Sequence, residues 1–295
     1  MCFAKTGRAF LGATVVFVAG GCAGSGFGLS NAVPPSPPPT ATQPRPTNLF
    51  PAAAGSDNRP RPRTVPVLIR FSIVRSDVPL GEVSESGKIW NHVDEDILKA
   101  DWAAHLRRNG IRVGRGTSSS WPPIRAILES ARGQRSKHEV FDIRTGDSLT
   151  LEIDTRPRDR SLFLYRPDGS MAGATFMQST NVLRIDFTVR PTELDTVALR
   201  IVPEVRQPNP DGSWAFTPEG LRPALPYISR TLHELAVETE VPPDHFIMIG
   251  PSGRADSPLL IGQALLTDTV DGQPFESVYF ITPEVRRTTG AGAPP

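Results

Sequence analysis

Cysteine is scarce in this sequence of 295 residues, because only Cys2 and Cys22 are present and both lie near the N-terminus. The chain after residue 22 can therefore form no internal disulfide bond and offers no cysteine to a metal site. Cys2 falls inside a predicted export signal, so an exported chain would carry Cys22 as a single unpaired thiol in an oxidising compartment. A modification of Cys22 would give that thiol a role.

Lysine is also scarce, since four of the 32 basic residues are lysine and the others are arginine. Residues 1–66 contain six basic residues and one acidic residue, a net charge of +5. The remaining chain contains 26 basic and 30 acidic residues, a net charge of −4. A mildly acidic folded part with interspersed signs presents no basic face for a phosphate backbone. We therefore expect no nucleic-acid partner.

Sequence motifs of catalysis and metal binding are missing as well. The stretch GPSGR at residues 250–254 has arginine where a nucleophile elbow needs its second glycine. The stretch HELAVE at residues 233–238 has Val237 where a zinc motif needs its second histidine. The acids Asp94–Asp96 are typical of the first turn of a helix, where the helix dipole favours negative charge. No catalytic residue, metal ligand or cofactor is therefore predicted.

The first 21 residues have the pattern of an export signal. Lys5 and Arg8 precede an uncharged apolar run, Phe10–Ala19. This run is too short for a membrane-spanning helix, which needs about 20 residues. We predict that residues 1–21 are a signal peptide and that the protein is exported to the cell envelope.

The small residues directly before Cys22 resemble the lipobox of bacterial lipoproteins. The stretch is Ala19-Gly20-Gly21-Cys22, and it departs from the family at Ala19, where leucine is usual. The resemblance implies that Cys22 becomes the lipid-modified first residue of the mature protein, carries palmitate, and binds the membrane through this lipid. Ala23, in place of aspartate, implies an outer-membrane lipoprotein that faces the periplasm or the cell surface. The alternative is an ordinary signal cleaved near Gly21, with Cys22 unmodified.

Residues 22–64 are predicted to be a disordered linker. Eleven of the 31 prolines fall between Pro34 and Pro66, in a segment without hydrophobic periodicity. Proline-rich chains favour extended polyproline structure, which can hold a domain away from a surface. Residues 288–295 are predicted to be a disordered tail.

Residues 65–135 are predicted to form a small β-α-β-α module. The stretch VPVLIRFSIV at residues 65–74 is apolar on both faces, as in a strand that is buried on both sides. Helical spacing of apolar residues predicts a helix over residues 94–110, which ends at Asn109-Gly110. A short strand and a second helix, capped by Ser120, are expected to follow.

Residues 136–287 are predicted to form a mostly antiparallel β domain. Apolar and polar residues alternate along residues 149–154 and 183–190, as in strands with one face buried. The stretch at residues 232–250 is predicted to be a long hairpin that turns at Pro242-Pro243-Asp244, although its first arm also suits a helix. The order of the elements predicts an α+β fold class.

The end of the chain, residues 240–287, resembles the C-terminal strands of the secretin family of outer-membrane channels. The matching stretches are VPPDHFIMIGP, LLIGQALL and VYFITPEVRR. The resemblance implies a subunit of a secretion or pilus channel, which would form oligomeric rings. The alternative is convergent patterning of a β-hairpin. The folded part is also similar, more loosely, to uncharacterised exported bacterial lipoproteins, which implies no activity.

Three of the four tryptophans cluster in a short stretch of the sequence. Trp90, His92 and Trp102 surround the start of a predicted helix, and Trp121 follows soon after. Exposed aromatic side chains can stack on sugars or receive a protein partner. We predict a partner or glycan surface from these four residues; the alternative is that they pack in the core against the first strand.

Three classes of function are compatible with these patterns. The first is a membrane-tethered, non-enzymatic envelope lipoprotein with a structural, scaffolding or assembly role, which would contact an envelope protein or a second copy of itself. The second is an accessory subunit of a secretin-type secretion or pilus channel. The third is an envelope hydrolase or glycan-binding protein, which requires a cleft with convergent titratable side chains.

Palmitate labelling of the full chain in a two-membrane bacterium tests the anchor. We expect the wild-type chain to incorporate labelled palmitate and Cys22→Ala to incorporate none, because the diacylated thiol is the anchor. Cys2→Ala is the matched control and keeps its label, since Cys2 lies within the signal. A wild-type chain without label would contradict the lipoprotein prediction.

Overall fold

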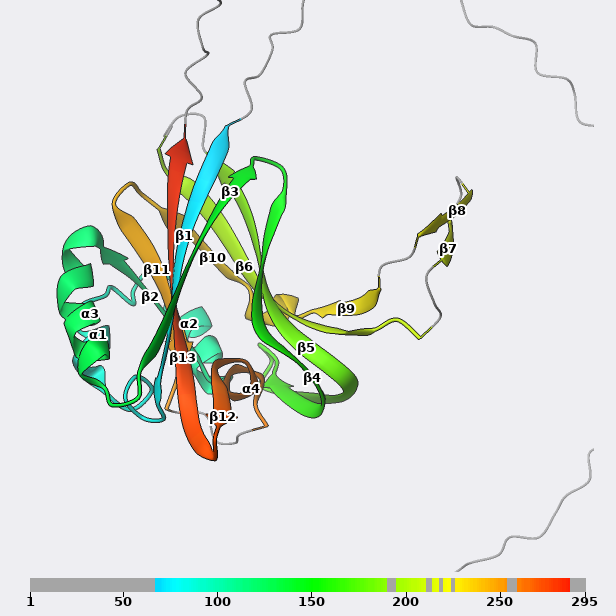
Figure 1. The fold of residues 1–295 in the computed structure, drawn as a ribbon, viewed down its shortest axis with the longest axis horizontal. Coiled ribbons are helices and arrows are strands. Elements are labelled where there is room, and N and C mark those ends of the chain that lie inside the picture. Colours follow the sequence, from blue (N-terminus) through cyan, green and yellow to red (C-terminus); the bar gives the residue numbers. More distant parts are fainter. Residues whose placement is uncertain are drawn as a thin grey trace, which may run out of the picture. The chain divides into compact units, whose positions relative to one another are not determined.

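The computed structural model describes residues 67–189, 195–210, 214–217, 220–223, 226–253 and 259–286. These residues belong to one compact unit of mostly antiparallel β structure with a few short helices (Figure 1). The predicted signal peptide, Cys22, the linker 22–64 and the tail 288–295 lie outside the described residues.

The first sheet joins strands from both ends of the described chain. Each neighbouring pair is antiparallel. Its strand order is β2 (Ile111–Thr117), β11 (His245–Pro251), β13 (Gln273–Arg286), β1 (Leu68–Pro79) and β3 (Arg135–Arg144), and β12 (Thr267–Val270) also pairs with β13.

The second sheet is formed by the middle of the chain and is also antiparallel. Two further strands, β7 (Trp214–Thr217) and β8 (Gly220–Pro223), pair with each other. The order in the second sheet is β10 (Val237–Val241), β6 (Val197–Pro208), β5 (Met171–Val189) and β4 (Ser148–Tyr165), and β9 (Tyr227–Thr231) pairs with β6.

Four short helices accompany the sheets. α1 and α3 lie on the face of the first sheet that is turned away from the second sheet (Figure 1). The helices are α1 (Gly87–Trp90), α2 (Ala100–Arg108), α3 (Trp121–Ser130) and α4 (Ile261–Leu266), and 3-10 turns occur at Ser118–Ser120 and His233–Leu235.

The main hydrophobic core lies between the two sheets. Ile69, Phe71 and Ile73 of β1 point into it, and the Phe71 ring lies 4.9 Å from that of Phe187 on β5. Full burial of one such side chain stabilises the fold by about 1.5–3 kcal/mol. The predicted alternation along β4 and β5 is confirmed, because its apolar residues lie in this core or, for Val189, pack against it. Those in the core are Leu149, Leu151, Ile153, Leu183, Ile185 and Phe187.

A second core lies on the other face of the first sheet. Val78 of β1 and Phe280 of β13 pack there against Trp90 of α1 and Ile124 of α3. The prediction that the first strand is buried on both sides is therefore confirmed. Ser120 precedes α3 as predicted, although its side chain makes no capping hydrogen bond.

The helix predicted over residues 94–110 is wrong in its first part, since α2 begins only at Ala100. Asp94 instead exchanges two backbone hydrogen bonds of 2.8 Å with Arg115 of β2. Glu95 accepts hydrogen bonds from Arg107 and Arg112. The acids of this stretch are therefore held by strand pairing and by arginines, and the helix dipole does not explain them.

The hairpin predicted at residues 232–250 is also wrong. The turn at Pro242–Asp244 is present, and Asp244 has a left-handed φ of 61°. However, β10 pairs with β6 in the second sheet, whereas β11 pairs with β2 and β13 in the first. The turn therefore carries the chain from one sheet to the other, and the helical alternative for the first arm reduces to one 3-10 turn at His233–Leu235.

Strands of the predicted module at residues 65–135 do not pair with each other. β13 and β11 lie between β1 and β2, and β1 pairs with β3 along ten positions. The observed order in this stretch is β1, α1, α2, β2 and α3, so the predicted β-α-β-α order is modified by an extra helix. The predicted boundary at residue 135 coincides with the start of β3, whose ladder with β1 joins residues from both sides of it.

Asn109 links the end of α2 to the end of β4. Its side chain is fully buried, its Oδ1 accepts from Tyr165 N at 2.7 Å, and its Nδ2 donates to the carbonyl oxygens of Tyr165 and His105 at 3.0 and 3.1 Å. Gly110 follows with φ of 84°, so the left-handed stop predicted for this helix is confirmed. Gly262 of α4 packs so closely against Asn109 that an added Cβ would lie 2.3 Å from its carbonyl oxygen.

Substitution of Asn109 tests this link. We expect Asn109→Ala to lower the free energy of unfolding by about 2–3 kcal/mol, because buried backbone groups of Tyr165 lose their partners. Asn91→Ala is the control, since Asn91 is exposed at the end of α1, and its effect should stay below about 0.5 kcal/mol. Urea unfolding of both full chains measures the difference; equal midpoints would show that Asn109 is not a structural link.

Candidate binding groove

A groove opens in the first sheet at the point where β11 and β13 separate. The two strands pair only through Ile247–Ile249 and Tyr279–Ile281, and beyond this point β13 continues beside β1 to Arg286. The space between them has a volume of about 580 Å³, within the range of ligand sites. Its lining comprises Ser72, Val74, Ser118, Trp121, Asp195, Pro243, Asp244, His245, Phe246, Phe280, Thr282, Pro283, Glu284 and Val285.

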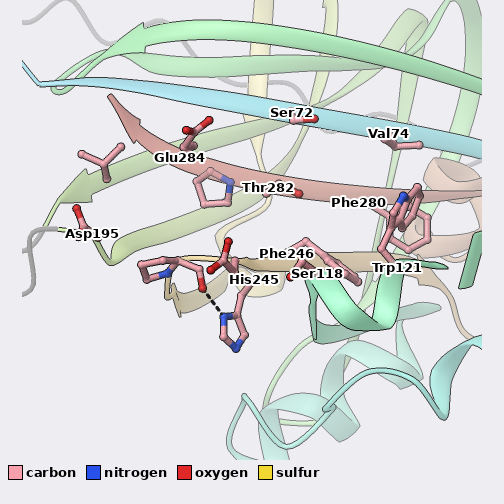
Figure 2. A pocket seen from close by; sticks show the side chains of 14 residues that line it. Ser72, Val74, Ser118, Trp121, Asp195, His245, Phe246, Phe280, Thr282 and Glu284 are labelled. Atoms are coloured by element: carbon pink, nitrogen blue, oxygen red, sulfur yellow. Dashed lines mark hydrogen bonds between the residues drawn. The ribbon is translucent and has the colours of Figure 1, made fainter. Parts of the chain in front are cut away.

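Three aromatic rings form one end of the groove. Trp121 at the start of α3 lies 4.9 Å from Phe280, and Phe246 lies 5.7 Å from Phe280, both in edge-to-face orientation. Figure 2 shows Trp121 and Phe280 together at this end. Phe246 and Phe280 are buried, whereas Trp121 is half-buried. The indole is therefore the aromatic surface that a bound group can reach.

Gly116 of β2 makes room for the aromatic end. It pairs with Phe246 across the β2–β11 ladder, and a Cβ at Gly116 would lie 2.2 Å from the Phe246 ring. A side chain here would push the ring towards Phe280 and Trp121. The shape of this end of the groove therefore depends on a residue without a side chain.

The other side of the groove is acidic. Asp195 lies just before β6, Asp244 in the turn between the sheets, and Glu284 near the end of β13, and all three are exposed. Glu284 pairs with Arg286 at 2.9 Å, but Arg286 does not line the groove. Figure 2 shows Asp195 and Glu284 at the end away from Trp121. The groove thus combines an aromatic end with carboxylates from three separate elements.

Backbone hydrogen bonds hold the turn that forms one wall. Ser118 N donates to Asp244 O at 2.8 Å, and His245 Nδ1 donates to Pro243 O at 2.7 Å (Figure 2). Because Asp tolerates the left-handed conformation better than most residues do, Asp244 suits its φ of 61°. The position of the Asp244 carboxylate is therefore set by the turn.

The four predicted surface residues do not form one exposed surface. Trp90 and Trp121 belong to the second core beside Val74 and Val78 of the first strand, in keeping with the alternative of core packing. Trp90 is 2% exposed, and its Nε1 donates to Val83 O at 2.9 Å. Trp102 packs against the main core and donates to Ala236 O at 2.8 Å, while His92 is half-buried in the loop after α1. Of the four, Trp121 alone lines the groove. Cys22, the predicted lipid site, lies outside the described residues.

Sequence reasoning missed the other groove residues. Phe246, Phe280 and Glu284 lie in the stretch that resembles secretin strands, and the sequence pattern there indicates strands and no binding residues. The signal for them is the register of the last strand, which places Phe280 opposite Met248 and Val74. That register could not be derived before the sheet partners were known.

Arginines lower the pKa of carboxyl groups elsewhere on the domain. Burial alone would raise the pKa of Asp154, but hydrogen bonds from Arg160, from the backbone N–H of Arg156 and from Arg158 outweigh burial and lower it. These arginines lie on the bulged part of β4, and Arg158 also bonds Asp268 of β12 at 3.0 Å. The other carboxyl groups with a lowered pKa are Glu95, Asp142, Asp168, Asp186 and Glu204, and none of them lines the groove.

Two further observations concern the described residues alone. They include no group of three or more His, Cys, Asp or Glu side chains arranged to hold a metal ion. They also include no helix that is long and apolar enough to cross a membrane.

Comparisons with known proteins find secretin domains among solved structures. The InvG secretin domain of the Salmonella SPI-1 injectisome shares 9% identity over 78% of this chain and 66% of its own, with a TM-score of 0.23. The Klebsiella pneumoniae type II secretion complex of PulD, PulS and PulC shares 11% identity over 75% of this chain and 40% of its own, with a TM-score of 0.21. The secretin GspD of E. coli K12 shares 15% identity over 75% of this chain and 50% of its own, with a TM-score of 0.19.

The chain thus spans 40 to 66% of the length of these three structures. No family model matches the chain, and no curated protein matches it.

The lowered pKa of Asp154 predicts a pH dependence of stability. A carboxyl group whose pKa is depressed by folding stabilises the protein above its unfolded pKa of about 4, and this stabilisation is lost as the pH falls through the folded pKa. We expect Asp154→Asn to have a lower free energy of unfolding than the wild type at pH 7. The difference between the two free energies should become smaller below about pH 4. Urea unfolding between pH 7 and pH 3 measures it.

Glu238→Gln is the control for this experiment, because Glu238 forms an exposed ion pair with Arg200 that should contribute little. A gap between wild type and Asp154→Asn that is constant from pH 7 to pH 3 would argue against the arginine cluster as its cause.

Proposed function

We propose that this chain is a membrane-tethered, non-enzymatic envelope lipoprotein with a scaffolding or assembly role. In this proposal Cys22 carries the lipid, residues 22–64 form the tether, and the described domain contacts another protein chain. The anchor is supported by the lipobox-like sequence. The protein contact is supported by the outer strand β3.

β3 forms an edge of the first sheet. Among the described strands it pairs only with β1, and Val140 in its middle is 51% exposed. An edge strand presents unpaired backbone groups on which another strand can add. Lys137, Glu139 and Asp142 on the same strand make indiscriminate pairing unfavourable, so a partner strand has to match their charges.

The ionisation of the domain supports a binding role over a catalytic one. A general acid that works near neutral pH needs a carboxyl pKa raised towards 7. Among the described residues, the carboxyl groups with a shifted pKa have a lowered pKa, in most cases because of hydrogen bonds from arginine, and they lie outside the groove. These groups are fixed charges that hold strands together.

Photo-crosslinking in cells tests the proposed contact. With benzoylphenylalanine in place of Val140 in the full chain, we expect protein adducts, because the side chain lies on an edge available to a partner. Benzoylphenylalanine in place of Met171 is the control, since Met171 is 58% exposed but lies at the turn between β4 and β5. Absence of adducts from position 140, or equal adducts from both positions, would overturn the role of β3.

The second candidate function is an accessory subunit of a secretin-type channel. It is favoured by the same edge strand, because ring assembly needs strand edges that pair between neighbours. The crosslinking experiment separates the two candidates. A ladder of adducts between copies of this chain supports the ring, whereas a single adduct with a different envelope protein supports the scaffold.

A further inference from the structure

We propose that the groove between β11 and β13 binds an extended, positively charged peptide segment of a partner protein. The inference rests on the proposed function in taking another protein chain as the ligand, but it concerns a different surface from the β3 edge. Three features of the groove carry it: an unpaired strand edge, a set of carboxylates and an aromatic end.

The unpaired edge favours a ligand in extended conformation. Along Thr282–Arg286, β13 pairs with β1 on one side, and the ladder with β11 on the other side has already ended at Ile281. The backbone of this stretch therefore faces the groove without a strand partner among the described residues. A peptide laid along β13 can complete these hydrogen bonds, as in recognition by strand addition. Pro283 removes one donor from this edge and leaves the pairing short.

The carboxylates of the groove favour a ligand with positive charge. Asp244 and Glu284 come from two elements that converge on the groove, where Asp195 also lies. Asp195 makes an interaction of its own, and Glu284 pairs with Arg286 at 2.9 Å, so Asp244 is the main source of negative charge for a ligand. An isolated cluster of acids would be an ordinary solvated surface. Here the acids border a groove with an open backbone edge, so a basic side chain placed there would be held in register with a bound strand.

The aromatic end gives the ligand its direction. Trp121 is half-buried and packs on Phe280 and Phe246, which fix its ring. An apolar side chain at one end of the peptide would cover the indole, and arginine or lysine side chains would reach the carboxylates at the other end. The groove therefore fits a segment with apolar residues at one end and basic residues at the other.

Fluorescence anisotropy with a labelled decapeptide that has valines in one half and arginines in the other half tests the proposal. We expect the full chain in mild detergent to bind it at low salt, to bind it more weakly in 0.5 M salt, and not to bind the same peptide with glutamate in place of arginine. The variant Asp244→Asn/Glu284→Gln should weaken binding roughly fivefold or more, because two attractive charges are lost and the shapes are kept.

The matched control is Asp101→Asn/Glu129→Gln, which removes the same charge from exposed positions on α2 and α3. Equal weakening by both double variants would reduce the binding to general electrostatics and overturn the site. Trp121→Phe is the second probe of the groove; because it keeps the core packed, an unchanged affinity would overturn the aromatic end.

Other occupants are separated by the same assay. The chain has its own arginines next to proline at residues 59, 61 and 63. If the peptide binds only after Arg59→Ser/Arg61→Ser/Arg63→Ser, the occupant is a segment of this chain and the partner proposal fails. Peptide binding without adducts from position 140 would support the groove and overturn the proposed contact through β3. Adducts from position 140 without peptide binding would overturn the groove alone.

Discussion

The pairing of β13 with β1 is the interaction on which the rest of the described domain depends. The ladder runs through twelve positions, from Leu68 opposite Arg286 to Pro79 opposite Phe275. β3 is attached to the free side of β1, and β11 and β12 are attached to β13. The residues of these two strands also supply both cores, since Phe71 and Ile281 face the second sheet while Val78 and Phe280 face α1 and α3. Loss of this one ladder would remove the middle of the first sheet and part of both cores.

The groove follows from the same ladder. Because β1 satisfies one side of β13 to its end, β13 can continue straight after β11 has turned away towards the second sheet. The turn at Pro242–Asp244 makes this departure necessary, since β10 belongs to the second sheet and β11 to the first. The separation of the two strands creates the open edge, and the turn itself supplies Asp244. The turn that connects the two sheets therefore also creates the groove.

Much of the fold could be predicted from the sequence, because apolar and polar residues alternate along many of the strands. The alternation along β4 and β5, the two-sided burial of β1 and the stop after Asn109 are all visible in the residues. The sequence does not show which strands pair with each other. A turn such as Pro242–Asp244 indicates that the chain changes direction, but not which sheet the next strand joins. Helical spacing over residues 94–110 misled for a related reason: Arg107, Arg112 and Arg115 bind Glu95 and Asp94 and keep this stretch in the loop. Of the groove, only Trp121 was singled out, since the other lining residues gather only when β11 and β13 find their register.

The ladder between β1 and β13 also has a kinetic consequence. Asp77 and Ser277, which form a side-chain hydrogen bond beside this ladder, are 200 residues apart in sequence. Closing so long a loop is entropically costly and slow, and folding rates fall as contacts become more distant along the chain. One edge of β1 therefore stays unpaired until the last strand is available. This delay leaves an unpaired strand edge that can add strands of other chains, so the first strand is open to aggregation until the last strand pairs with it.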